Sequence, residues 1–219
     1  MSDDARRELL ARVAAATEGV RDDDPAAAHA ALPRAYRRTG TAGPAALASL
    51  LEERLVDYGV DVVRTRTRDL AAAIASELRR RRARRVVMPD DLPAAWTREA
   101  TGVERLPGDA SADELDDADA VVTGCALAVA ETGSLVLDGG AAQGRRALTL
   151  VPDVHLCVVA ASQVVELVPE ALERLEAAAA AGAPVTWISG PSATSDIELS
   201  RVAGVHGPRT LGVLLVLDA

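Results

Sequence analysis

The stretch Val154-His-Leu-Cys-Val-Val-Ala160 decides the fold class, because a continuous apolar run of this kind is typical of a strand buried on both faces of a parallel sheet. Outward from it, strand-like and helix-like patterns alternate from Gly59 to the end of the sequence. Such alternation predicts an α/β fold with a mixed, mostly parallel sheet and helices on both faces. The strands that end near Met88, Thr123 and Ser189 are expected in that one sheet. Strands are predicted at residues 60–65, 85–88, 118–123, 134–137, 154–160, 185–189 and 210–217. Helices are predicted at residues 69–82, 169–181 and 196–202, and a helical turn is predicted at residues 125–130.

The first 44 residues show helical patterns only. Residues 3–18 are predicted as a polar helix, and residues 26–38 as a second short helical piece interrupted at Pro33. Pro44 suits the first turn of a further helix that runs to about Tyr58. We therefore expect two parts, an N-terminal helical extension of residues 1–44 and a single domain of residues 45–219.

The composition excludes several kinds of chemistry. All 24 basic residues are arginine, and the 219-residue chain has no lysine, no asparagine and no phenylalanine. Pyridoxal-phosphate enzymes, lysine aldolases, Walker-A NTPases and kinase-type phosphoryl transfer are excluded because each needs a lysine, and an arginine guanidinium stays protonated and forms no Schiff base. The scarcity of aromatic rings and the formal net charge of −9 both disfavour a nucleic-acid partner. The run Arg79-Arg-Arg-Arg82 is interpreted as a solvated helix end, where cations complement the helix dipole.

Neither membrane insertion nor a metal site is expected. No apolar run reaches the length of a membrane-spanning helix, and the start of the sequence lacks signal-peptide features, so a cytoplasmic protein is predicted. Cys125 and Cys157 are expected to be free thiols, too few to hold an iron–sulfur cluster within one chain. The three histidines fit no zinc-binding spacing, and His155 is interpreted as a satisfied core residue. No metal and no cofactor is predicted in this chain.

The most distinctive polar segment is Trp187-Ile-Ser-Gly-Pro-Ser-Ala-Thr-Ser-Asp-Ile-Glu198. A strand is expected to end at Gly190, and a helix is expected to begin near Asp196, so backbone N–H groups, the helix dipole and several hydroxyls make an anion site plausible. Ser195 with Glu198 also matches a capping box, and this structural role is favoured for the pair over ligand contact. The candidate ligand-binding residues here are Gly190, Pro191, Ser192, Thr194, Ser195 and Asp196.

Two further segments carry candidate site residues. Glu131 stands beside Thr132-Gly-Ser134 at the start of a strand, where its carboxylate either points into a cleft or remains in solvent. His206, in Gly204-Val-His-Gly-Pro208, either belongs to a site or makes a turn-stabilising hydrogen bond. We expect these residues and the loop of residues 190–196 to converge on one anion-preferring pocket at the carboxyl ends of the strands. Glu131 and His206 are the candidate catalytic residues. Thr132, Gly133 and Ser134 are further candidate ligand-binding residues.

Together these segments resemble the LUD-domain proteins. The resemblance rests on Ala130-Glu-Thr-Gly-Ser134, on Gly190-Pro-Ser-Ala-Thr-Ser-Asp-Ile-Glu198, and on Gly204-Val-His-Gly-Pro208 before a Leu/Val-rich last strand. It covers roughly residues 45–219 and is most specific over residues 185–217. It implies a NagB/RpiA/CoA-transferase-like fold and participation in the cytoplasmic oxidation of L-lactate to pyruvate, with iron–sulfur clusters on partner subunits. Family membership by itself implies no catalytic mechanism for this chain.

Two classes of function remain open. In the first, the chain is a subunit without a cluster in a lactate-oxidising complex, where it binds a small anionic ligand or supports assembly. In the second, it is a stand-alone enzyme on a CoA-transferase-like scaffold, with Glu131 as nucleophile or base and the loop of residues 190–196 holding a phosphate or carboxylate. Co-purification with cysteine-rich partners would favour the first class, and turnover of a CoA thioester or a sugar phosphate the second.

Overall fold

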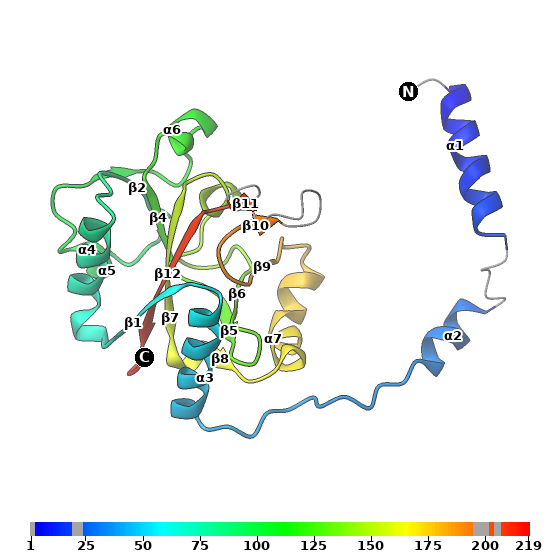
Figure 1. Cartoon of the computed structure of the whole chain (residues 1–219), viewed down its shortest axis with the longest axis horizontal. Coiled ribbons are helices and arrows are strands. Elements are labelled where there is room, and N and C mark those ends of the chain that lie inside the picture. The colour runs from blue at the N-terminus through cyan, green and yellow to red at the C-terminus, as the bar shows by residue number, and fades with distance from the viewer. Residues whose placement is uncertain (1–2, 19–23, 195–201, 204–206) are drawn as a thin grey trace. The chain divides into compact units, whose positions relative to one another are not determined.

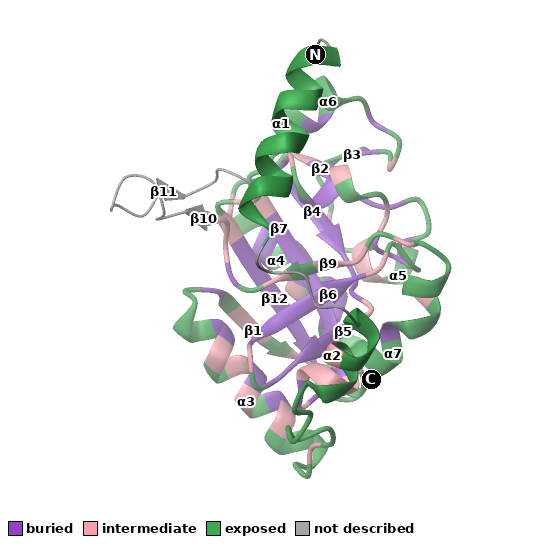
Figure 2. Cartoon of the chain, turned by 90° about the vertical axis from the view of Figure 1, so that its right-hand side faces the viewer, coloured by how far each residue is buried: buried purple, intermediate pink, exposed green. Residues whose placement is uncertain are grey.

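Six parallel strands form the central sheet in a computed structural model of the chain, which describes residues 3–18, 24–194, 202–203 and 207–219 (Figure 1). Two of these strands, β7 and β12, pair along their whole length and are buried except at Val154, Ala160 and Thr210, which are partly exposed (Figure 2). The apolar run at residues 154–160 is thus a central strand of a parallel sheet, as predicted. In spatial order the strands are β1 (Asp61–Thr65), β12 (Thr210–Val216), β7 (Val154–Ala160), β4 (Ala120–Thr123), β2 (Arg85–Val87) and β3 (Glu104–Leu106).

A second, smaller sheet packs against the first. Its β6 strand is antiparallel to both β5 and β9, whereas β5 and β8 are parallel. Ala128 of β5 and Leu135 of β6 share an apolar cluster with Cys157 and Val159 of β7, which identifies the contact between the two sheets. In spatial order the strands of the second sheet are β8 (Val164–Val165), β5 (Leu127–Val129), β6 (Ser134–Leu137) and β9 (Thr186–Ile188).

Helices cover the outer faces of both sheets. On the central sheet, α4 (Leu70–Arg80) buries Ile74 and Leu78 in the cluster that contains β7 and β12 residues. On the second sheet, α7 (Val168–Ala180) buries Ala171 and Leu175 against β5 and β6. A further helix, α3 (Pro44–Asp57), packs into the cluster between the two sheets. This part of the chain also contains the short helices α5 (Ala94–Thr97) and α6 (Ala112–Asp116) and the 3-10 turns Thr67–Asp69, Arg146–Thr149 and Ala161–Gln163. A two-stranded sheet is formed by β10 (Ala193–Thr194) and β11 (Val202–Ala203).

The structure corrects two expectations about the sheets, and it describes only the last residue of one predicted helix. The strand ending before Ser189 is β9, which belongs to the second sheet, so one face of the central sheet is covered largely by strands and not by helices. The residues expected as a helical turn at 125–130 contain β5, because Leu127 and Val129 face α7 while Ala128 faces the central sheet. Alternation with a period of two suits a strand buried on both faces, not a helix. Of the helix expected at residues 196–202, residues 196–201 lie outside the described residues and Val202 lies in a strand.

The arginine-rich end of α4 is exposed at Arg79, Arg80 and Arg82, as expected, but the Arg81 side chain is buried. The Arg81 side chain is only 7% exposed and forms an ion pair with Glu77, while its Nη2 atom lies 2.8 Å from the Asp61 carboxylate. Arg80 pairs with the same two carboxylates, at 2.6 Å for Asp61 and 2.8 Å for Glu77. These arginines therefore join α4 to the start of β1 and present no row of free cations.

The segment Met1–Tyr36 forms a unit of its own, and Arg37–Ala219 forms the other. The first unit contains α1 (Asp3–Ala16) and α2 (Pro25–Ala31), and neither helix has a buried residue. Asp24 caps α2 by accepting hydrogen bonds of 3.0 Å from the amides of Ala26 and Ala27. Among the described helices, none combines the length and the apolar character needed to cross a bilayer.

Candidate functional site

Two of the predicted segments meet at one cavity of about 230 Å³. Gly190, Pro191 and Ser192 line it together with Gly207 and Pro208, the residues that follow His206. The amide of Ser192 donates a 2.9 Å hydrogen bond to the carbonyl of Pro208, which holds the two segments side by side. The segments at residues 190–192 and 207–208 therefore line one cavity. Its remaining lining residues are Arg146, Thr149, His155, Thr186, Trp187, Ile188, Ser189 and Leu211.

The donors that face this cavity suit an anion. Arg146 contributes a guanidinium, whose Nη1 atom lies 3.3 Å from the Thr149 hydroxyl oxygen. No carboxylate pairs with Arg146 among the residues that the structure describes. Ser189 and Ser192 add hydroxyl groups to the lining. A guanidinium fork beside hydroxyl donors is the arrangement with which proteins bind carboxylates and phosphates.

His155 is the buried polar group of this cavity. Its Nε2 atom lies 2.8 Å from the hydroxyl oxygen of Thr123 in a fully buried contact. Its Nδ1 atom is also buried, and it has no hydrogen-bond partner within the described part of the chain. A buried nitrogen without a partner is costly, and a ligand in the adjoining cavity is one way to satisfy it. The sequence interpretation of His155 as a satisfied core residue is therefore only half correct.

The cavity lies at the amino ends of the central strands. His155 is the second residue of β7 and Leu211 the second residue of β12. The expected position at the carboxyl ends is therefore wrong for the central sheet. The reason is that Gly190 follows β9, which belongs to the second sheet.

An adjoining cavity of about 430 Å³ shares Arg146, Thr149 and Thr186 with the first. Asp138 and Arg145 lie on its wall. Arg145 is engaged elsewhere, since its Nε atom donates a 3.0 Å hydrogen bond to the carbonyl of Gly108. Arg146 is thus the cation shared by both spaces.

The segment at residues 131–134 reaches the edge of this site through its hydroxyl groups. The Ser134 and Ser189 hydroxyl oxygens are 2.7 Å apart, and the Thr132 hydroxyl donates to Ser134 at 2.8 Å. Ser189 lines the cavity, whereas Thr132, Gly133 and Ser134 do not. The hydroxyl groups of Thr132 and Ser134 hold Ser189, the residue that follows β9, and neither residue lines the cavity.

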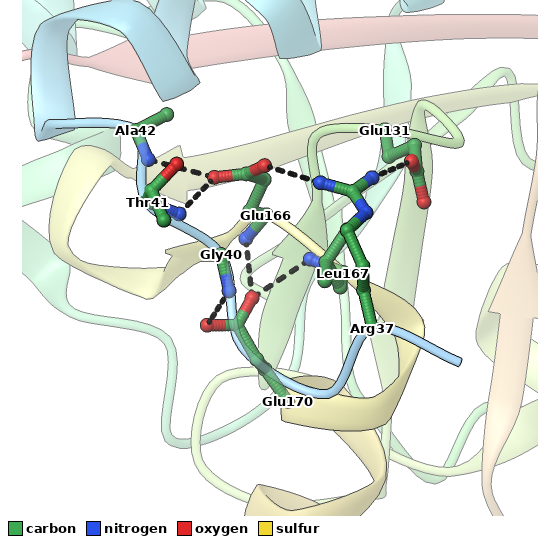
Figure 3. A network of polar contacts seen from close by, with 8 residues as sticks. All are labelled: Arg37, Gly40, Thr41, Ala42, Glu131, Glu166, Leu167 and Glu170. Atoms are coloured by element: carbon green, nitrogen blue, oxygen red, sulfur yellow. Dashed lines mark hydrogen bonds and ion pairs between the residues drawn. The ribbon is translucent and has the colours of Figure 1, made fainter. Parts of the chain in front are cut away.

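Glu131 points away from the cavity to an ion pair. Its carboxylate accepts a 2.6 Å hydrogen bond from Arg37, which also reaches the Glu166 carboxylate at 3.3 Å (Figure 3). Glu166 further accepts hydrogen bonds of 2.7 Å from the amides of Thr41 and Ala42. This network fixes the chain before α3, and it gives no support to Glu131 as a nucleophile.

Two motif glycines have a packing role. Gly133 has φ +61°, and a Cβ atom there would lie 2.7 Å from the Cβ of Arg54. Gly190 has φ +85°, and its Cβ would lie 2.9 Å from the Cβ of Tyr58. Both positions need a left-handed backbone and a close approach to the end of α3, conditions that only glycine meets without strain.

The remaining predicted site residues cannot be placed in the cavity. Thr194 lies in β10 (Ala193–Thr194), which pairs with β11 (Val202–Ala203). Ser195, Asp196 and His206 lie outside the described residues, as do Glu198 and the predicted capping box. The sequence analysis did not identify Arg146 as a site residue. For His155 a signal was available, because it is a polar residue inside an apolar run.

The two cysteines are buried free thiols. A hydrogen bond with Cys157, together with burial, raises the pKa of Cys125 well above its ordinary value, so this thiol stays protonated. Within the described ranges, no group of three or more His, Cys, Asp or Glu residues is arranged to hold a metal ion.

Comparison with known proteins identifies relatives over most of the chain. Residues 48–216 match the family model of the LUD domain. The chain is 50% identical over 165 residues to lactate utilization protein C of Deinococcus radiodurans, covering 75% of this chain and 77% of that protein. It is 28% identical over 190 residues to lactate utilization protein C of Geobacillus thermodenitrificans, covering 78% and 79% of the two chains.

A solved structure agrees with these matches. The crystal structure of a DUF162 family protein from Deinococcus radiodurans superposes with a TM-score of 0.70 at 42% identity, and the match covers 80% of this chain and 99% of that one. The motifs at residues 130–134 and 190–194 and the α/β core all fall within the matched family region. The chain therefore belongs to the LUD domain family.

Proposed function

We propose that this protein takes part in the cytoplasmic oxidation of L-lactate to pyruvate as a subunit without a metal cluster, and that its cavity at Arg146 and His155 binds a small carboxylate or related anion. The relatives named lactate utilization protein C support the pathway. The single observation that supports anion binding is a cavity that combines an arginine without a carboxylate partner and a buried imidazole nitrogen without a partner, both among the described residues. The NagB/RpiA/CoA-transferase-like classification of the fold belongs to the same proposal.

The charges around the cavity favour an anion over a cation. Arg146 faces it, whereas the neighbouring Arg209 is neutralised by Asp153 at 2.9 Å. Lactate and pyruvate each carry one carboxylate, which a guanidinium and adjacent hydroxyl groups recognise by charge-assisted hydrogen bonds. Their second oxygen matches a further donor such as the hydroxyl group of Ser189 or Ser192.

Isothermal titration calorimetry with lactate, pyruvate and phosphate tests the cavity. The Arg146→Gln variant removes the cation, and Arg209→Gln is the matched control because Arg209 does not line the cavity. A hydrogen bond to a charged group contributes about 1.5–3 kcal/mol, so R146Q is expected to weaken anion binding by about tenfold to hundredfold while R209Q leaves it unchanged. Absence of binding at millimolar concentration, or equal binding by R146Q, would overturn the anion site.

The role as a subunit has a separate test. Two buried cysteines cannot hold an iron–sulfur cluster, so electron transfer must be supplied by partner subunits that carry the clusters. Affinity purification of the full chain from its native cells, under anaerobic conditions, is expected to bring down proteins that contain iron, whereas the chain purified alone has far less than one iron per molecule. Stoichiometric iron in the isolated chain would contradict this division of labour.

A further inference from the structure

A separate cavity of about 450 Å³ lies at the opposite end of the central sheet. Val158 and Ala160 of β7 and Val216 of β12 line it, together with Gly124, which follows β4, and Thr67, which follows β1. These positions are at or just beyond the carboxyl ends of four parallel strands, where open α/β sheets bind ligands. We propose that this cavity, which we call the carboxyl-end cavity, binds a small, uncharged and predominantly apolar organic molecule.

The wall of the carboxyl-end cavity is mainly hydrocarbon. Trp96 and Pro93 face it from the segment around α5, and Leu70 faces it from the start of α4. The indole approaches the strand end closely, because a Cβ atom at Gly124 would lie 3.6 Å from Cη2 of Trp96. The volume falls within the range of ligand pockets, and an apolar lining of this size favours an apolar ligand.

Two polar side chains on the wall, those of Gln163 and Thr67, are already paired inside the protein. The Gln163 amide donates to the Cys125 carbonyl at 2.7 Å and accepts from the Ala160 amide at 2.9 Å. The Thr67 amide and hydroxyl both donate to the Asp218 carboxylate, at 2.7 Å and 3.0 Å. A strongly polar ligand would lose its hydration and gain few hydrogen bonds here.

The carboxyl-end cavity differs from the cavity at Arg146 and His155 in its charged groups. No arginine or histidine is among its lining residues. Two carboxylates lie beside it, since Asp218 binds Thr67 and Asp91 accepts a 2.8 Å hydrogen bond from the Ala142 amide. An anion would meet these carboxylates and no cation on the wall itself, so the ligand class is neutral.

The backbone at this cavity is held in a strained state. Ala142 lines the cavity with φ +61°, a left-handed conformation that is unfavourable for alanine. Its amide is fixed by Asp91, and its carbonyl accepts a 2.8 Å hydrogen bond from the Gly124 amide. Two hydrogen bonds thus hold Ala142 in its strained conformation. Because strained backbone conformations cluster at ligand-binding sites, this supports a binding role for the wall.

The test uses toluene as the neutral probe and benzoate as the same ring with a negative charge. The methyl groups of Leu70, Val158 and Val216 report on the carboxyl-end cavity in methyl NMR spectra of the full chain. Toluene is expected to shift these three residues in a saturable manner, and benzoate is expected to bind there at least about tenfold more weakly because burial of an unpaired charge is costly.

A filling substitution locates the binding. Ala160→Leu places three more carbon atoms at the wall and is expected to abolish the toluene-induced shifts, whereas Ala161→Leu, one residue outside the lining, is expected to leave them unchanged. Should A160L fail to fold, Ser162→Leu fills the cavity from an exposed position. The proposal is overturned if toluene produces no saturable shift, if benzoate binds as tightly as toluene, or if the folded filling variant still binds.

Discussion

The hydroxyl oxygen of Thr123 and the Nε2 atom of His155 lie 2.8 Å apart, and this hydrogen bond links the neighbouring parallel strands β4 and β7. Both residues are completely buried. The bond fixes one nitrogen of the imidazole, while the other nitrogen is buried beside the first cavity without a partner in the described structure. A single interaction thus contributes to the stability of the sheet and also orients a group at the candidate site.

Thr123→Val keeps the side-chain shape and removes the hydroxyl. We expect it to lower the free energy of unfolding by about 1–3 kcal/mol, because it leaves the Nε2 atom of His155 buried without a partner. Urea denaturation measures the effect, with the exposed Thr101→Val as the control. A loss no larger than that of T101V would mean that the hydrogen bond makes no net contribution.

The central sheet could be predicted from the sequence because its main strands carry strong local signals. Residues 154–160 and 210–216 are apolar at almost every position, and the structure places them side by side. The short strand Glu104–Leu106 was not predicted, since two of its three residues are exposed and charged. The membership of β9 in a second sheet depends on pairing with β6, about fifty residues earlier in the chain, and no local pattern encodes that partner.

The candidate site was predictable to a similar extent. The motifs at residues 190–192 and 207–208 stand out by their glycine and proline content, and they line one cavity. Arg146 could not be identified, because one arginine among 24 has no distinguishing pattern until the fold brings it to the cavity. Glu131 was misleading for the opposite reason, since its motif is distinctive while its carboxylate pairs with Arg37.

Gly190→Ala is expected to destabilise the protein through both backbone strain and steric contact. Gly182 provides the matched control, since its φ of +73° is similar but a Cβ atom there would meet nothing within 4 Å. We expect Gly182→Ala to cost about 1 kcal/mol for the left-handed backbone, and G190A to cost about 1–3 kcal/mol more for the contact with Tyr58. Thermal unfolding of the two variants measures the difference, and equal costs would show that the chain near Tyr58 relaxes freely.

Arg81→Met tests the buried charges at the end of α4. The variant leaves the Glu77 carboxylate, whose side chain is 11% exposed, with Arg80 as its remaining partner among the described residues. We expect a loss of about 2–4 kcal/mol in the free energy of unfolding, because an incompletely compensated buried charge is costly. Arg79→Met in the same helical turn removes an exposed cation and should change stability by less than about 0.5 kcal/mol. Similar losses in the two variants would place the Arg81 pair among the weak surface interactions.

The last prediction concerns pH and the segment before α3. Hydrogen bonds from the amides of Ala42 and Thr41, with a smaller contribution from Arg37, lower the pKa of the Glu166 carboxyl below its ordinary value (Figure 3). Because the folded state favours the carboxylate, this contribution to stability is complete above the unfolded pKa of about 4.3. It is lost as the pH falls through the lower pKa of the folded state.

The amide proton shifts of Thr41 and Ala42 are therefore expected to titrate together, with a midpoint below about pH 4.3 in NMR spectra recorded between neutral pH and the onset of acid unfolding. Glu166→Gln should remove this titration, because the neutral amide cannot ionise. Glu131→Gln is the control, since it removes one ion pair of Arg37 and leaves both backbone hydrogen bonds to Glu166 intact. A midpoint at or above the ordinary value, or a titration that persists in E166Q, would show that Glu166 does not hold this segment as a carboxylate. Such a result would assign the order of residues 37–43 to Glu170, which accepts a 3.1 Å hydrogen bond from the amide of Gly40.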